Sequence, residues 1–122
     1  MKLPSLELLS EVFGEEVEHV DSALSYFEIE SSSLLGIKIN GIHRYWSIYE
    51  IAHKCKEWAL KKHELAIFSG SEGFQSSWFE AKVYETRDYK LFQIRSEAGL
   101  TELDAIFKAC EWIRKKLIKE NA

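Results

Sequence analysis

The stretch Ser47-Ile-Tyr-Glu-Ile-Ala-His-Lys-Cys-Lys-Glu-Trp-Ala-Leu-Lys-Lys62 predicts the element around which the rest of the fold is organised. Its apolar residues recur at i, i+3, i+4 and i+7, which places them along one stripe of an α-helix. Ser47 and Glu50 have the spacing of a capping box, in which each side chain accepts a hydrogen bond from a backbone N–H of the first turn. Lys61 and Lys62 end the stretch, where positive charge offsets the helix dipole. We therefore expect an amphipathic helix with one face in a core.

Two more helices are predicted by caps and apolar spacing. Residues 5–13 carry an apolar face, and this short helix has Ser5 as its cap and Gly14 as its stop. A longer helix begins at Thr101, whose hydroxyl is a cap, and ends in a cluster of basic residues. Its predicted core stripe consists of Leu103, Ile106, Phe107, Cys110, Ile113 and Leu117.

A first hairpin is predicted where the apolar period changes to two. Residues 17–20 form a short strand that turns at Asp21-Ser22, and residues 23–30 then pair with the strand that begins at Leu34. In this register Phe27 lies opposite Ile37. Asn40-Gly41 is a turn signal that leads on to residues 42–46.

A second hairpin follows residues 65–68, which read as a short buried strand. Residues 78–86 and 89–97 pair around Arg87-Asp88, with Thr86 opposite Tyr89. The expected pairs on one side are Val83 with Phe92, Ala81 with Ile94 and Phe79 with Ser96. On the other side they are Glu80 with Arg95, Lys82 with Gln93 and Tyr84 with Leu91.

These elements predict a single α+β domain over residues 1–122. An antiparallel sheet of about five to six strands, built from the two hairpins, is covered by the short N-terminal helix and the two long amphipathic helices. The long helices can be aligned so that Ser47 matches Thr101 and Trp58 matches Trp112. This similarity has two explanations: an internal repeat, or convergence of two amphipathic helices with basic ends.

Composition and charge limit the classes of function. No apolar run approaches the roughly 18 to 20 residues of a membrane span, and the N-terminus lacks a signal-peptide core, so we expect a cytoplasmic protein. Residues 1–33 hold eight of the 20 carboxylates but one of the 16 basic side chains. The candidate acidic patch comprises Glu15, Glu16 and Glu18. It is interpreted either as a surface for a basic partner or as a solvated surface.

The chemistry-bearing residues predict no enzyme, no cofactor and no metal site. The chain has no G-x-S-x-G, H-E-x-x-H or Walker sequence. His53 and Glu57 are spaced to share a helix face, but no third ligand is visible. Cys55 and Cys110 fall on apolar stripes, where a thiol acts as a small hydrophobe, and a structural disulfide between them is not expected in the cytosol.

The polar side of the second hairpin is the candidate protein-binding surface. It combines apolar anchors with charge, a mixture typical of interfaces, and comprises Trp78, Glu80, Lys82, Tyr84, Leu91 and Arg95. An alternative interpretation is that the N-terminal helix covers this face.

Ile51-Ala-His-Lys-Cys-Lys-Glu-Trp-Ala59 and Ala105-Ile-Phe-Lys-Ala-Cys-Glu-Trp112 together resemble a paired helix signature of small uncharacterised phage and prophage proteins. The plan is similar to that of phage α-β-α sandwich proteins. This resemblance implies a phage-encoded protein that binds a host protein, for example an anti-CRISPR-like inhibitor in counter-defence. The alternatives are a nucleic-acid-binding accessory protein, which would act through the lysine faces of the two long helices, and a homo-oligomeric structural or regulatory module; a host protein is favoured over nucleic acid as the partner. A monomer or a homodimer is expected, with no membrane partner.

Overall fold

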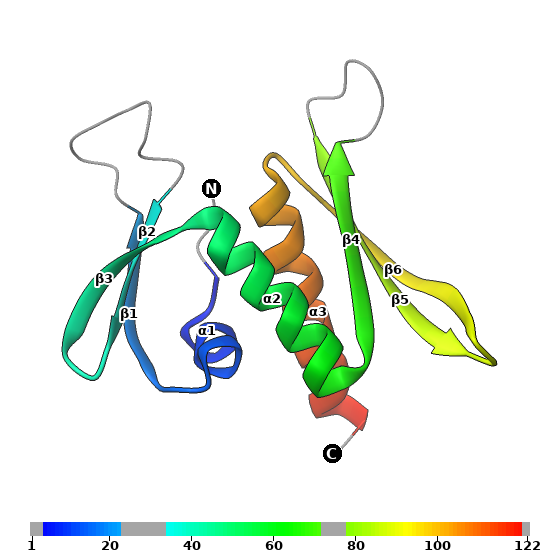
Figure 1. Ribbon diagram of the computed structural model, residues 1–122, viewed down its shortest axis with the longest axis horizontal. Coiled ribbons are helices and arrows are strands. Elements are labelled where there is room, and N and C mark those ends of the chain that lie inside the picture. Colours follow the sequence, from blue (N-terminus) through cyan, green and yellow to red (C-terminus); the bar gives the residue numbers. More distant parts are fainter. Residues whose placement is uncertain (1–3, 23–33, 72–77, 121–122) are drawn as a thin grey trace. The chain divides into compact units, whose positions relative to one another are not determined.

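The computed structural model describes residues 4–22, 34–71 and 78–120, and it has the predicted α+β class (Figure 1). Within these ranges the backbone forms three helices and six strands. In chain order they are α1 (Leu6–Phe13), β1 (Val17–Ser22), β2 (Leu34–Ile39), β3 (Ile42–Ser47), α2 (Ile48–His63), β4 (Leu65–Ser71), β5 (Phe79–Arg87), β6 (Lys90–Gly99) and α3 (Glu102–Glu120).

The chain divides into two compact units within α2. The first unit, Lys2–Lys54, holds α1, the sheet β1-β2-β3 and the start of α2; the second, from Cys55 onward, holds the rest of α2, the sheet β4-β5-β6 and α3. Both three-stranded sheets are antiparallel. The described strands therefore form two sheets where a single sheet was predicted. That residues 1–122 form one domain stays a prediction.

In the first sheet β2 is the central strand, and its register differs from the predicted one. Ile37 pairs with Val20 of β1 on one side and with Arg44 of β3 on the other, so the pairing of Ile37 with Phe27 was wrong. The expected strand over residues 23–30 and its loop lie outside the described residues. β1 also continues through Ser22, where a turn was expected.

The turn between β2 and β3 was predicted correctly. Asn40 and Gly41 have φ values of 53° and 77°, and positive φ at both central residues is the property of a type I′ hairpin turn. Ile39 faces Ile42 directly across this turn. The short loop fixes the register, so Ile42, Arg44 and Trp46 lie on the same side of β3.

In the second sheet β5 is the central strand, and the turn lies one residue later than expected. Asp88 and Tyr89, at φ 50° and 65°, form a two-residue turn between Arg87 and Lys90. The ladder is therefore shifted from the predicted one. A β-bulge between Val83 and Tyr84 then changes the register again, so that Val83 pairs with Arg95.

The helix boundaries agree closely with the predicted ones. Ser5 accepts a hydrogen bond from the N–H of Leu8 and caps α1, and Gly14 ends that helix at φ 72°. Thr101 caps α3 by accepting from the N–H of Asp104, at 3.0 Å. At α2 the Ser47 hydroxyl accepts from the N–H of Tyr49, at 3.2 Å, where the capping box predicted Glu50.

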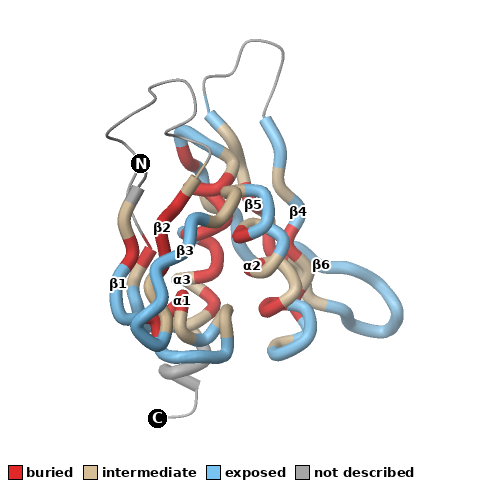
Figure 2. Tube along the Cα trace, turned by 60° about the vertical axis from the view of Figure 1, so that its left-hand side comes forward, coloured by how far each residue is buried: buried red, intermediate tan, exposed pale blue. Residues whose placement is uncertain are grey.

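The buried residues follow the predicted helix stripes and the central strands. Figure 2 shows burial concentrated in α3 and β2, whereas most of β3 is exposed. Ile51, Trp58 and Ile106 are buried as expected, but Phe92 is 43% exposed: the shifted ladder pairs it with Glu85, two residues nearer the turn than Val83. Among the described residues, no helix is both long enough and apolar enough to cross a bilayer.

Candidate binding surfaces

The second sheet has one covered face and one open face. α3 packs along β4, β5 and β6, and Leu65, Ile67, Ala81 and Val83 are buried on the covered side. Alternation along β4 and β5 directs Phe68 and Tyr84 to the opposite side. We call this side the outer face; its described residues are Ala66, Phe68, Gly70, Glu80, Lys82, Tyr84, Thr86, Leu91, Gln93, Ser96 and Ala98.

Aromatic and aliphatic side chains lie open on the outer face. Phe68 and Tyr84 meet edge to face with ring centroids 5.3 Å apart. Phe68 is 54% exposed and Leu91 is 53% exposed. Trp78, just before β5, is also exposed, while α1 packs on β1 within the other unit. Cover of this face by the N-terminal helix, the other interpretation left by the sequence, stays a prediction.

The polar groups of the outer face are held in place across the strands. Ser96 donates to the Glu80 carboxylate at 3.2 Å, and the Tyr84 hydroxyl donates to the Gln93 side-chain oxygen at 3.4 Å. In the ladder Glu80 pairs with Ala98 and Tyr84 with Gln93, where Arg95 and Leu91 were predicted. The polar groups thus have fixed positions around the aromatic pair.

Arg95 does not belong to the outer face. It lies opposite Val83 on the covered side, with its guanidinium 5.5 Å from the ring centroid of Trp112 in α3 and an ion pair to Glu97 at 2.7 Å. Its placement beside Glu80 was wrong because the bulge in β6 reverses the side on which residues beyond it point. Glu80, Lys82, Tyr84 and Leu91 keep their predicted side, and Trp78 precedes β5.

The acidic residues of the first unit are exposed but do not act alike. Glu18 accepts from the N–H of Gly41 at 2.9 Å and pairs with Lys38 at 3.8 Å, so its charge is used to hold the β2–β3 turn. Glu15 lines a pocket, and Glu16 is exposed beside it in sequence. An acidic patch made of these three residues stays a prediction.

The pocket beside Glu15 was not predicted from the sequence. It has a volume of about 320 Å³ and is lined by Phe13, Glu15, Ile37, Ile39, Asn40, Ile42, Arg44, Trp46 and Lys54. All nine residues belong to the first unit. The alternation of Ile42, Arg44 and Trp46 was a usable signal for the strand that lines it, but nothing local connects that strand to Phe13 or Lys54.

A histidine–carboxylate pair crosses the other side of the first sheet. His43 Nε2 lies 3.2 Å from Asp21 Oδ1, and the two side chains reach over Gly36 of the central strand. A Cβ at Gly36 would lie 2.7 Å from His43 Cε1. Glycine therefore permits this pair. The pair is a contact between β1 and β3.

Cys55 and Cys110 are free and fully buried. The Cys110 thiol lies 4.0 Å from the carbonyl oxygen of Cys55, on the neighbouring helix. A hydrogen bond with the Cys55 side chain, together with burial, raises the pKa of Cys110 well above its usual value. Because the thiolate is the nucleophile, this residue is unsuited to nucleophilic catalysis.

We expect both thiols to be protected in the folded protein. A thiol-specific disulfide reagent should react with them at least about a hundredfold more slowly than after unfolding, because attack requires local opening and ionisation. Ser71→Cys, at an exposed position, should add one fast-reacting thiol and serves as the control. Fast reaction of the two native thiols in the folded protein would contradict the buried placement.

The potential metal ligands in the described parts of the chain do not form a cluster. Over residues 4–22, 34–71 and 78–120, no three His, Cys, Asp or Glu side chains are grouped so that they could hold a metal ion. Glu57 accepts from Lys61 at 3.3 Å, one turn along α2.

Comparisons with known proteins identify no relative. No protein-family model matches the chain, and searches of the curated proteins and of the solved structures returned no match. The function is therefore argued from the surfaces described above.

Proposed function

We propose that this protein works by binding another protein through the outer face of its second sheet, without catalysing a reaction. The open pair formed by Phe68 and Tyr84, flanked by Leu91, is the observation that carries this proposal. Such side chains supply most of the binding energy of protein interfaces when they are desolvated by a partner.

The charges around this pair favour a polar, specific partner surface. Glu80 and Lys82 are at positions i and i+2 of β5, so a negative and a positive side chain lie on the same face as the aromatic pair. Opposite charges on a partner would determine the orientation in which it binds and would add less to the affinity. The phage context follows from the helix resemblance alone, and within it the partner is a host protein of the cytoplasm, with counter-defence as the role.

Direct nucleic-acid binding has weaker support. Lys61 and Lys108 form ion pairs with Glu57 and Asp104 in their own helices. Cations that are already paired release fewer counterions from a phosphate backbone. A homo-oligomer formed by two outer faces stays an alternative. Light scattering at low and high protein concentration distinguishes it from a monomer.

The test is capture from bacterial lysate with the full chain as bait. The outer-face variant, Phe68→Ser with Tyr84→Ser and Leu91→Ser, should lose the partner that the native protein retains at stoichiometric amount. With the purified partner, its affinity should fall by more than about thirtyfold, because each buried anchor contributes about 2 kcal/mol or more. Expression of the native protein should also raise the plating of a phage that the host restricts.

A control variant removes exposed aromatics elsewhere. Tyr45→Ser with Tyr49→Ser changes two residues that are 60% and 73% exposed in the first unit and should bind like the native protein. The proposal fails if the outer-face variant binds as well as this control. It also fails if no stoichiometric partner appears and phage plating does not change. A low-salt mobility shift or a concentration-dependent mass would instead favour nucleic acid or self-association.

A further inference from the structure

The pocket of the first unit has the features of a small ligand site that is separate from the outer face. Its volume of about 320 Å³ lies at the lower end of the range for such sites, roughly 300 to 1,000 Å³. Ile37, Ile39 and Ile42 form an apolar floor at the β2–β3 turn. Ile42 is 63% exposed although it is a large aliphatic residue, so its side chain is available to an apolar ligand.

Two aromatic rings form one wall of the pocket. Phe13, at the end of α1, meets Trp46, at the end of β3, with centroids 5.0 Å apart and nearly perpendicular planes. This edge-to-face arrangement is the favoured one for aromatic pairs. It fixes the indole against the pocket, where a ligand would contact it.

Two cations gather at the same indole. The Arg44 guanidinium carbon lies 4.8 Å from the ring centroid of Trp46, and Lys54 Nζ lies 5.4 Å from it and 5.3 Å from that of Phe13. Neither cation forms an ion pair with a carboxylate within the described parts of the chain. Contact with a ring leaves their N–H groups able to donate to an anion.

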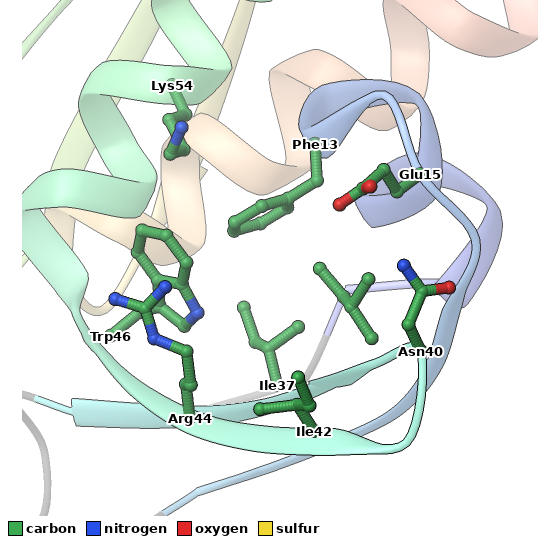
Figure 3. A pocket seen from close by; sticks show the side chains of 9 residues that line it. Phe13, Glu15, Ile37, Asn40, Ile42, Arg44, Trp46 and Lys54 are labelled. Carbon is green, nitrogen blue, oxygen red and sulfur yellow. The ribbon is translucent and has the colours of Figure 1, made fainter.

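The opposite end of the pocket has different chemistry. Figure 3 shows Glu15 and Asn40 on one side, and Arg44, Trp46 and Lys54 on the other, with Ile37 and Ile42 between them. The Glu15 carboxylate accepts hydrogen bonds, so it suits an N–H donor on the ligand. Two cations and one carboxylate leave a single net positive charge in the lining.

We propose that this pocket binds a carboxylate carried on an apolar body. The carboxylate accepts from Arg44 and Lys54, the body covers the isoleucine floor and the two rings, and an N–H on the far side donates toward Glu15. One net positive charge matches a monoanion, and Glu15 disfavours a more highly charged group such as a phosphate. Either a free small acid or the C-terminal residue of a protein chain offers this chemistry. The inference does not rest on the proposed outer-face function.

The test uses the full chain and the four indole N–H signals of its tryptophans in a proton–nitrogen correlation spectrum. Trp46→Phe assigns one signal. Titration with 3-phenylpropionate should shift that signal, and 3-phenylpropanamide, which has the same shape without the charge, should bind about tenfold more weakly. The proposal is overturned if the acid and the amide bind equally well. It is also overturned if millimolar concentrations of 3-phenylpropionate do not shift the Trp46 signal.

Cation removal provides the second measurement. Lys54→Met and Arg44→Met keep most of the aliphatic length, and each should weaken 3-phenylpropionate binding by about tenfold. Lys61→Met removes a cation from the same helix, where the side chain is 74% exposed and paired with Glu57, and should leave the affinity unchanged. If both pocket variants bind 3-phenylpropionate as tightly as the native protein, Arg44 and Lys54 do not hold its carboxylate.

The two ligand sources are separated by a peptide arm. Acetyl-Ala-Ala-Phe with a free C-terminus adds backbone N–H groups that can donate to the Glu15 carboxylate. If a chain end is the natural ligand, this peptide should bind more tightly than 3-phenylpropionate and lose that advantage as its C-terminal amide. If a free acid is the ligand, the small probe should bind more tightly.

Discussion

Replacing Phe107 by alanine should lower the free energy of unfolding by about 3 to 5 kcal/mol. Phe107 lies on the core stripe of α3 and is 3% exposed, so its removal leaves a cavity between α3 and its surroundings. A loss of this size is a large share of the roughly 5 to 15 kcal/mol that stabilises a domain. Urea unfolding followed by circular dichroism measures it as a lower midpoint at an unchanged slope.

Phe92→Ala is the matched control, because the same atoms are removed from a side chain that is 43% exposed. We expect a loss of no more than about 1 kcal/mol, since partly exposed apolar surface gains little from folding. The comparison also tests the ladder. Equal losses at the two positions would contradict the partial exposure of Phe92 in the ladder that pairs it with Glu85.

Gly99→Ala should destabilise the second unit by about 2 to 3 kcal/mol. Gly99 is buried at the end of β6, and a Cβ there would lie 2.6 Å from the backbone nitrogen of Ala105 and 2.8 Å from Asp104 Oδ2. The backbone of the first turn of α3 cannot rotate aside as a side chain can. Relief of the contact therefore requires β6 and α3 to move apart, which disturbs the core between them.

Gly70→Ala controls for the general effect of removing a glycine from a strand. Gly70 lies in β4, and a Cβ there meets nothing within 4 Å. The change should be neutral or should stabilise the protein by up to about 1 kcal/mol, because alanine restricts the unfolded chain. Thermal unfolding of both variants gives the comparison. A Gly99→Ala protein as stable as Gly70→Ala would show that β6 and α3 are not in close contact.

The helices could be predicted because their signals are local. Ser5 and Thr101 cap through contacts three residues away, and Gly14 stops α1 through its own φ. The Asn40-Gly41 turn was predictable for the same reason. The Asp88-Tyr89 turn was not, because a tyrosine at φ 65° is rare and the sequence favoured Arg87-Asp88.

The candidate surfaces were predictable in part. Alternation along β5 placed Glu80, Lys82 and Tyr84 together, and the structure confirms their shared side. Arg95 was misplaced, because a bulge has no reliable sequence signal. The pocket escaped prediction, because it joins residues of α1, β2, β3 and α2 that share no spacing.

The sequence by itself determined the α+β class, the three helices with their caps and apolar stripes, and the turn at Asn40-Gly41. These follow from hydrogen bonds and side-chain periods that span a few residues. Only the tertiary structure decided that the described strands form two sheets, that Ile37 pairs with Val20, and that Arg44 and Lys54 meet at Trp46. Strand pairing joins distant segments with a period of two, so several registers satisfy one apolar pattern, and packing of the whole unit selects among them.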